Sequence, residues 1–265
     1  MKKYVLLFLL LISFNSFSQK DSIINYFDRK GKITADKSKI RFFEIITKST
    51  GSKWLTKRYR KNGKQFAYWY TKDKARKTKT GESVTYHKSG KIASIAYYNS
   101  EGKKQGAYKS WFNNTEKNIQ GIYLNDQKAG VWKYYHYNGK LASKKIYKND
   151  SLLRSSYYND KGIEINHDKK LCLAPAKFKG GHKAFSVKIK ELYPKLGYKI
   201  KGKLFVNITV NVYGKITDVT IDEELSEDLK NKIITFFENI KGWSPATEVH
   251  RKVPFNFSIP LKFRG

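Results

Sequence analysis

Cysteine is almost absent from this sequence, and so is any apolar run long enough to cross a membrane. The chain has 265 residues and one cysteine, Cys172, so it can form no internal disulfide. Its fold must therefore be held by buried apolar surface and hydrogen bonds. Cys172 is interpreted as a small linker or core residue.

The longest apolar run is Tyr4–Phe14, near the N-terminus. A membrane-spanning helix needs about 20 apolar residues, so this run is too short. Lys2 and Lys3 precede it, and Ser16-Phe17-Ser18 resembles a cleavage site, which predicts a signal peptide over residues 1–18. After cleavage we expect no membrane span. The exported chain would be periplasmic, associated with the outer membrane, or secreted, and the sequence leaves these three open.

Motifs of catalysis and metal binding are missing as well. No HExxH or CxxC spacing occurs among the five histidines and the cysteine, and the glycines do not form a phosphate-binding loop. Ser226 is interpreted as a helix cap rather than a nucleophile. The acidic pairs Glu223-Glu224 and Glu227-Asp228 are interpreted as favouring the positive end of a helix. We therefore predict no catalytic residue, metal or cofactor; a hydrolase of unknown type is kept as a third alternative. The histidines are His87, His136, His167, His182 and His250.

Negative charge is scarce: 54 Lys and Arg face 22 Asp and Glu, a formal net charge of +32. Such a field attracts polyanions, including lipopolysaccharide phosphates and acidic glycans. Only eight of the basic residues are arginine, however, and lysine lacks the planar fork that recognises phosphates and bases bidentately. The lysines are also spread along nearly the whole chain. The lysines are therefore interpreted first as a solvated surface. Nucleic acid is not expected as a partner, because an exported protein meets little of it.

A repeat is present over the N-terminal half. Gly81, Gly106 and Gly130 open similar units, and aromatic residues recur about every twelve residues after them. A unit of this length fits one strand and a tight turn, so the pattern predicts an antiparallel meander of about ten strands in which each strand pairs with its sequence neighbours. Aromatic residues at a fixed phase are expected to stack across strands. The signature residues are Gly81, Tyr86, Gly106, Trp111, Gly130, Trp132, Tyr135 and Gly139.

The best unit is Gly130–Asn149, which reads as a complete hairpin. Asn138-Gly139 between its arms predicts a type I′ turn. Its pattern, G-x-W-x-x-Y-x-x-N-G-K-L…Y-x-N, resembles the MORN-type repeats of bacterial YwqK-like proteins over roughly residues 25–165, and the resemblance implies scaffolding and partner binding. In the middle repeat Thr115-Glu116 replaces Gly-Lys, so a different turn type is expected there.

The C-terminal half predicts the order helix, strand, strand, helix, strand. A helix over Ala184–Tyr193 is expected to end at Pro194, and Lys203–Tyr213 alternates as a half-buried strand with Leu204, Val206, Ile208, Val210 and Val212 on one side. A second strand, Ile216–Ile221, precedes a helix capped by Ser226, and the last strand alternates from Val253 to Phe263.

This second block resembles the C-terminal domain of TonB. The matching residues are Gly180, Gly181, Tyr193, Pro194, Gly214, Trp243, Pro245 and Pro260. Lys179 departs from the pattern, since the family usually has proline there. The chain also lacks the uncleaved membrane anchor and the proline-rich spacer of TonB itself. The resemblance implies recognition by an exposed sheet edge to which a partner adds a strand.

The predicted organisation is a signal peptide (1–18), an all-β repeat domain (19–162), a linker (163–177) and an α+β domain (178–265). The leading hypothesis is a non-enzymatic cell-envelope protein whose C-terminal module binds a protein partner, such as an envelope or outer-membrane protein in transport across the outer membrane. The alternative is an electrostatic binder of envelope polyanions through the basic repeat face. The partner and the free sheet edge are left open.

Overall fold

Antiparallel β-structure dominates the computed structural model, which describes residues 22–166, 173–196 and 202–263. One sheet has twelve strands in the order β1 to β12, and each strand pairs only with its sequence neighbours. The predicted meander is therefore confirmed, with two strands more than expected. Its strands are β1 (Ser22–Phe27), β2 (Phe42–Lys48), β3 (Trp54–Arg60), β4 (Gln65–Thr71), β5 (Lys79–Tyr86), β6 (Ile92–Tyr98), β7 (Gly106–Trp111), β8 (Lys117–Leu124), β9 (Gln127–Tyr135), β10 (Leu141–Lys148), β11 (Ser151–Tyr158) and β12 (Glu164–Ile165).

The turn between β9 and β10 is not the type I′ turn that was predicted. Gly139 has φ 81°, but Asn138 is not among the residues with positive φ. The N–H of Gly139 donates to the carbonyl of His136, and the N–H of His136 donates to Lys140. This is a type I turn followed by a left-handed glycine. Type I′ geometry, with two positive φ angles, occurs instead at Asn125-Asp126 and Asn149-Asp150.

The middle repeat keeps the same turn, contrary to the prediction. Thr115 takes the position of the glycine with φ 76°, and its N–H donates to Phe112 as the N–H of Gly139 does to His136. A β-branched residue in the left-handed region is strained, because its side chain crowds the backbone. The repeat register therefore imposes the turn on a residue that does not favour it.

Trp132 is the packing centre of the best-formed repeats and is 1% exposed. Its ring contacts those of Tyr108, Tyr123 and Tyr147, and its Nε1–H donates to the carbonyl of Ile122. Gly121 gives it room, since a Cβ on that glycine would lie 2.2 Å from the indole. Aromatic rings therefore contact one another across strands, but Tyr123 and Tyr147 meet Trp132 rather than the equivalent residue of the next repeat.

The C-terminal half contains a three-stranded sheet in the order β15-β14-β19, with β14 (Gly202–Val210) between β15 (Ile216–Ile221) and β19 (Phe255–Phe263). Leu204, Val206, Ile208 and Val210 of β14 are buried toward the helices, as the alternation predicted. The helices are α1 (Gly181–Lys190), α2 (Leu192–Leu196) and α3 (Glu227–Glu238); the short strands are β13 (Lys177–Phe178), β16 (Trp243–Ser244), β17 (Ala246–Glu248) and β18 (Arg251–Val253).

Two helix predictions differ in outcome. Ser226 caps α3 by accepting the N–H of Leu229, as predicted. Pro194 does not end the first helix: α1 stops at Lys190, and Pro194 lies inside α2. Proline is tolerated there because the first turn of a helix needs no N–H partner.

The segment 163–177, interpreted as a linker, contributes β12 and part of β13, and Ala174 bridges Thr247. The predicted signal peptide and the residues Cys172 and His167 lie outside the described residues.

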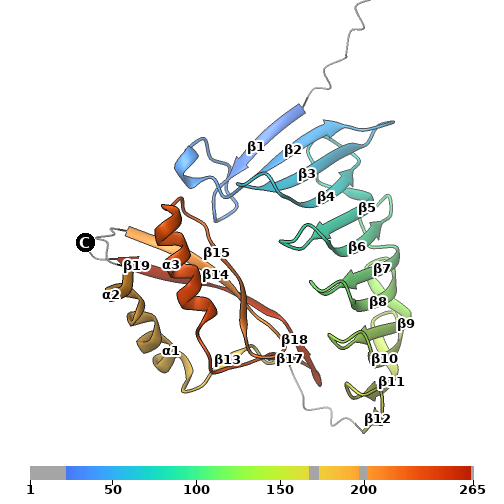
Figure 1. The fold of residues 1–265 in the computed structure, drawn as a ribbon. Helices are drawn as coiled ribbons and strands as arrows, with labels where there is room; N and C mark the ends of the chain where they lie inside the picture. Colours follow the sequence, from blue (N-terminus) through green and yellow to red (C-terminus); the bar gives the residue numbers. More distant parts are fainter. Residues whose placement is uncertain (1–21, 167–172, 197–201, 264–265) are drawn as a thin grey trace, which may run out of the picture.

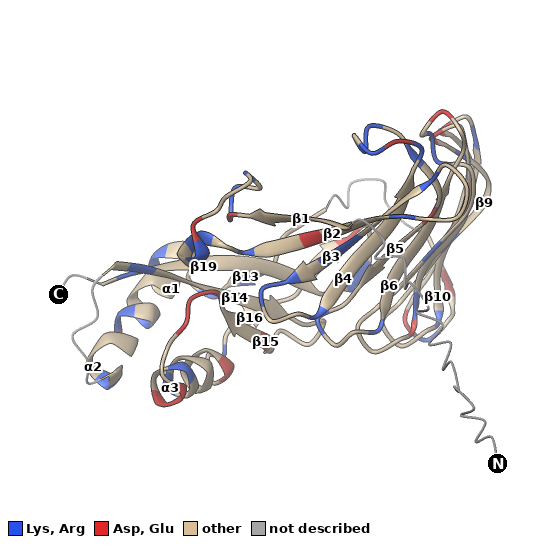
Figure 2. Cartoon of the chain, turned by 90° about the horizontal axis from the view of Figure 1, so that it is seen from above, with Lys and Arg blue, Asp and Glu red and all other residues tan. Residues whose placement is uncertain are grey.

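The meander forms an arc, and the C-terminal half lies on its inner side (Figure 1). Lysine and arginine are distributed over both halves of the chain (Figure 2). No helix in the described ranges is long and apolar enough to cross a membrane.

Candidate functional site

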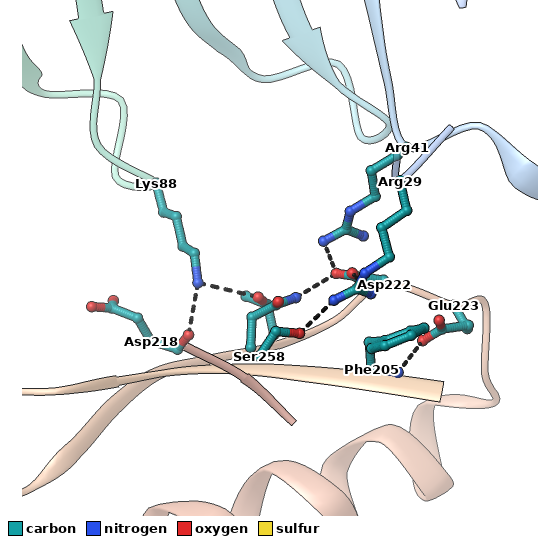
Figure 3. Close-up of polar contacts among 10 residues, drawn as sticks. Arg29, Arg41, Lys88, Phe205, Asp218, Asp222, Glu223 and Ser258 are labelled. Carbon is teal, nitrogen blue, oxygen red and sulfur yellow. Dashed lines mark hydrogen bonds and ion pairs between the residues drawn. The ribbon is translucent and has the colours of Figure 1, made fainter. Parts of the chain in front are cut away.

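The two halves meet where hairpin turns of the meander reach the loop after β15. This loop carries Asp222, whose side chain is 7% exposed and forms ion pairs with Arg29 and Arg41 (Figure 3). Arg29 lies 2.7 Å from the carboxylate, and its guanidinium is 3.3 Å from the ring centroid of Phe205. Burial, and then the neighbouring charge of Arg29, lower the pKa of Arg41 to about 10. Two cations therefore share one buried carboxylate.

Strand β15, at one edge of the C-terminal sheet, also lies against the meander. The Nζ of Lys88 donates to the carbonyl of Asp218 at 3.1 Å and to Oγ1 of Thr220 at 3.2 Å (Figure 3). Burial lowers the pKa of Lys88, although the charge of Asp218 opposes this. A lysine at a turn of the meander thus satisfies a backbone carbonyl of the edge strand.

The acidic residues before α3 have a different role from the one predicted. Glu223 accepts the backbone N–H of Phe205, and Glu224 forms an ion pair with Lys61 at 2.7 Å. The first helical turn itself contains Glu227 and Asp228. The dipole interpretation fits Glu227 and Asp228, whereas Glu224 contacts the meander and Glu223 bonds β14 within the C-terminal half. We call the contact zone between the two halves the seam.

At the other end of the seam, the β17–β18 hairpin inserts Arg251 into the meander. Arg251 is 3% exposed and donates to the carbonyl of Tyr135 at 2.9 Å, to Oδ1 of Asn118 at 2.7 Å and to Glu248. Its guanidinium lies over the ring of Tyr134. Neither repeat nor motif in the sequence pointed to this arginine.

The opposite edge of the C-terminal sheet is β19. The carbonyl of Phe205 accepts the N–H of Asp222, so the backbone groups of Phe205 point toward β15. Backbone groups alternate in direction along a strand, so those of the even-numbered residues of β14 point toward β19. The register then directs the backbone groups of Asn256, Ser258, Pro260 and Lys262 outward. In the described part of the chain β19 is the last strand of its sheet. Pro260 at an outward position has no N–H to leave unpaired.

The residues of the TonB-like signature gather around the sheet and its helices. Trp243 contacts the rings of Phe178, Phe185 and Phe257, and Tyr193 contacts Phe263. A Cβ at Gly214, where φ is 75°, would lie 2.2 Å from the carbonyl oxygen of Trp243. The remaining members are Gly180 and Gly181 at the start of α1, Pro194 in α2, Pro245 between β16 and β17, and Pro260 in β19.

The repeat signature lies along the meander rather than in one place. Gly81, Gly106 and Gly130 all have positive φ within strands, and Tyr86, Trp111 and Tyr135 end β5, β7 and β9. These residues define the sheet and converge on no common point. The hydroxyl of Tyr135 donates to Gln120.

Two histidines, His87 and His136, occupy the same position in their repeats and make the same kind of contact. Nε2 of His87 lies 2.9 Å from the carbonyl of Trp111, and Nε2 of His136 lies 2.8 Å from that of Tyr158. Each ring thereby joins its turn to the strand end of the next repeat. His250 contacts the carbonyl of Tyr158 as well. Across residues 22–166, 173–196 and 202–263, no three His, Cys, Asp or Glu side chains group as a metal site.

No family model matches the chain, and no curated protein matches it.

Proposed function

We propose that this chain is a non-enzymatic cell-envelope protein, exported by residues 1–18, in which the meander holds a C-terminal binding module. The module binds an extended segment of a partner protein, such as an outer-membrane protein, through strand β19. One observation carries the proposal: Lys88 of the meander binds the backbone of the edge strand β15, whereas at β19, the other edge of the sheet, Arg29 contacts only the side chain of Ser258. The resemblances to MORN-type repeats and to the TonB C-terminal domain support it.

Strand addition needs backbone groups that point away from the sheet. At β19 these are the N–H groups of Asn256, Ser258 and Lys262 and the carbonyls of all four outward residues. The side chains of the four are exposed. Because recognition is through the main chain, the partner needs an extended segment, and the net charge of +32 favours a segment with acidic residues.

Proline at position 258 tests the proposal, because it removes an outward N–H and leaves the ladder to β14 intact. Ser258 also accepts a hydrogen bond from Arg29, so Ser258→Ala is the matched control for the loss of the hydroxyl. A cross-linking pull-down from the cell envelope should recover the same partner with the wild type and Ser258→Ala, but not with Ser258→Pro. Urea unfolding of both variants checks that the sheet is retained.

Two results would contradict the proposal. One is a failure to recover any protein partner that depends on residues 178–265. The other is a partner retained by a folded Ser258→Pro variant.

A further inference from the structure

A basic hollow lies on the meander under the loop between β4 and β5. Its volume is about 410 Å³, and its walls include Glu44, Arg58, Trp69, Arg76 and Lys79. These residues come from β2, β3, β4, the loop and the start of β5. The seam and β19 contribute no residue to it, so it is independent of the proposed strand addition.

Glu44 is the one acidic residue in the wall, and it is completely buried. Arg58 donates to its Oε1, from Nε at 2.8 Å and from Nη2, and Arg76 donates to its Oε2. A guanidinium has five N–H groups, so neither arginine is saturated by one carboxylate oxygen. Their side chains are 34% and 25% exposed, which leaves these donors accessible from the hollow.

Lys79 is the third cation, and its ammonium lies 5.2 Å from the ring centroids of both Trp69 and Tyr98. Burial lowers the pKa of Lys79, and the charges of Arg58 and Lys104 lower it further. The two rings offset part of the cost of this half-buried charge, and an anion beside the ammonium would offset more of it. The side chains of the wall carry three positive charges and one negative charge.

We propose that this hollow binds a phosphate monoester, with the dianionic group between Arg58, Arg76 and Lys79 and the organic part against Trp69. Two planar guanidinium groups suit the oxygens of such a group, because they donate in parallel pairs. The net charge of the wall matches a dianion. Trp69 lies beside these cations, with Arg58 5.0 Å and Lys79 5.2 Å from its ring centroid, so its ring is placed to contact the organic part, such as a sugar.

Lys79→Gln is the most informative variant, because the hollow as a binding site and the hollow as a purely structural feature predict different results. If the hollow binds a dianion, the variant should bind inorganic phosphate or glucose 6-phosphate at least about tenfold more weakly, since one charged partner is lost. Its thermal stability without ligand should change little, because the loss of two ring contacts offsets the removal of a half-buried cation. Arg76→Gln should also weaken binding while Arg58 still pairs with Glu44.

Calorimetric titration at physiological ionic strength measures both ligands, and Lys133→Gln is the control for diffuse charge. Lys133 is an exposed lysine on β9, outside the hollow, so its loss should leave the affinity unchanged. Tighter binding of glucose 6-phosphate than of phosphate, abolished by Trp69→Leu, would place the organic part against the indole.

Three results would overturn the inference. The first is no binding of either ligand by the wild type. The second is equal loss of affinity in Lys133→Gln and Lys79→Gln, which would indicate attraction by overall charge. The third is Lys79→Gln with unchanged affinity.

Discussion

Arg251 should contribute more to stability than any other arginine in the described part of the chain, and Arg251→Met tests this. Methionine has a similar length, but it removes the charge, every donor and the contact of the guanidinium with the ring of Tyr134. The carbonyl of Tyr135 and both oxygens of Asn118 then lose a charged donor at 2.7–3.2 Å. Glu248 loses its ion-pair partner as well.

The expected cost follows from burial. Removing one member of a buried charged pair costs about 3–5 kcal/mol, because the remaining groups stay desolvated. The side chain of Glu248 is 37% exposed and can be rehydrated, so about 3 kcal/mol is expected here. For a chain of this size that lowers the melting temperature by roughly 6–12 °C. Arg251→Lys should fall between wild type and Arg251→Met, because one ammonium cannot reach all the acceptors of the planar fork.

Urea unfolding followed by circular dichroism measures the loss. Arg154→Met is the matched control, since Arg154 is an exposed arginine on β11. Amide exchange around Asn118 and Tyr135 should also accelerate in Arg251→Met. The reasoning is wrong if Arg251→Met and Arg154→Met unfold at the same urea concentration.

Two further predictions concern the repeats. Thr115→Gly should stabilise the chain by about 1 kcal/mol, because relief of about 1–3 kcal/mol of strain exceeds the entropy cost of glycine. Gly90→Thr, in an equivalent turn, should lower the free energy of unfolding in urea by a similar amount. A destabilised Thr115→Gly would contradict the assignment of strain. Burial first, and then Tyr134, raise the pKa of Tyr147 to about 12. The neutral phenol is therefore favoured by folding, so its contribution is complete below pH 10 and lost as the pH rises through about 12. Tyr147→Phe should unfold at higher pH than wild type when absorbance and circular dichroism are followed together, and an unchanged midpoint would count against this.

The meander could be predicted because its information is local. Each strand pairs with the next one in sequence, so the aromatic and glycine spacing determines both the strands and their order. The turn type could not be predicted in the same way. Asn138-Gly139 favours a two-residue type I′ loop, but the repeat register places the turn one residue earlier and leaves only Gly139 with positive φ. At Thr115 the same register overrides the preference of the residue itself.

The seam and the hollow could not be predicted, because both join residues far apart in the chain. Arg29 and Asp222 are separated by 193 positions and share no periodic pattern. The position of Glu223 and Glu224 before α3 suggested an interaction with the helix dipole. Nothing in the sequence favoured their actual contacts with Phe205 and Lys61 instead. Glu44 and Arg76 are 32 positions apart, and no motif or repeat position relates them. Charged residues in a lysine-rich chain give no signal of which cation meets which carboxylate.

Docking against the meander selects one edge of the C-terminal sheet. A free three-stranded sheet offers two edges, and both could accept a strand. Here Lys88 satisfies the carbonyl of Asp218 on β15, and the positive φ of Asp218 (53°) interrupts the regular extended backbone of that strand. Strand β19 has a regular register to β14 from Phe255 to Phe263 and presents its other side outward. If β19 binds a partner strand as proposed, the seam leaves that edge rather than β15 for recognition. Weakening the seam, as in Arg251→Met, should then expose β15 to the same kind of pairing.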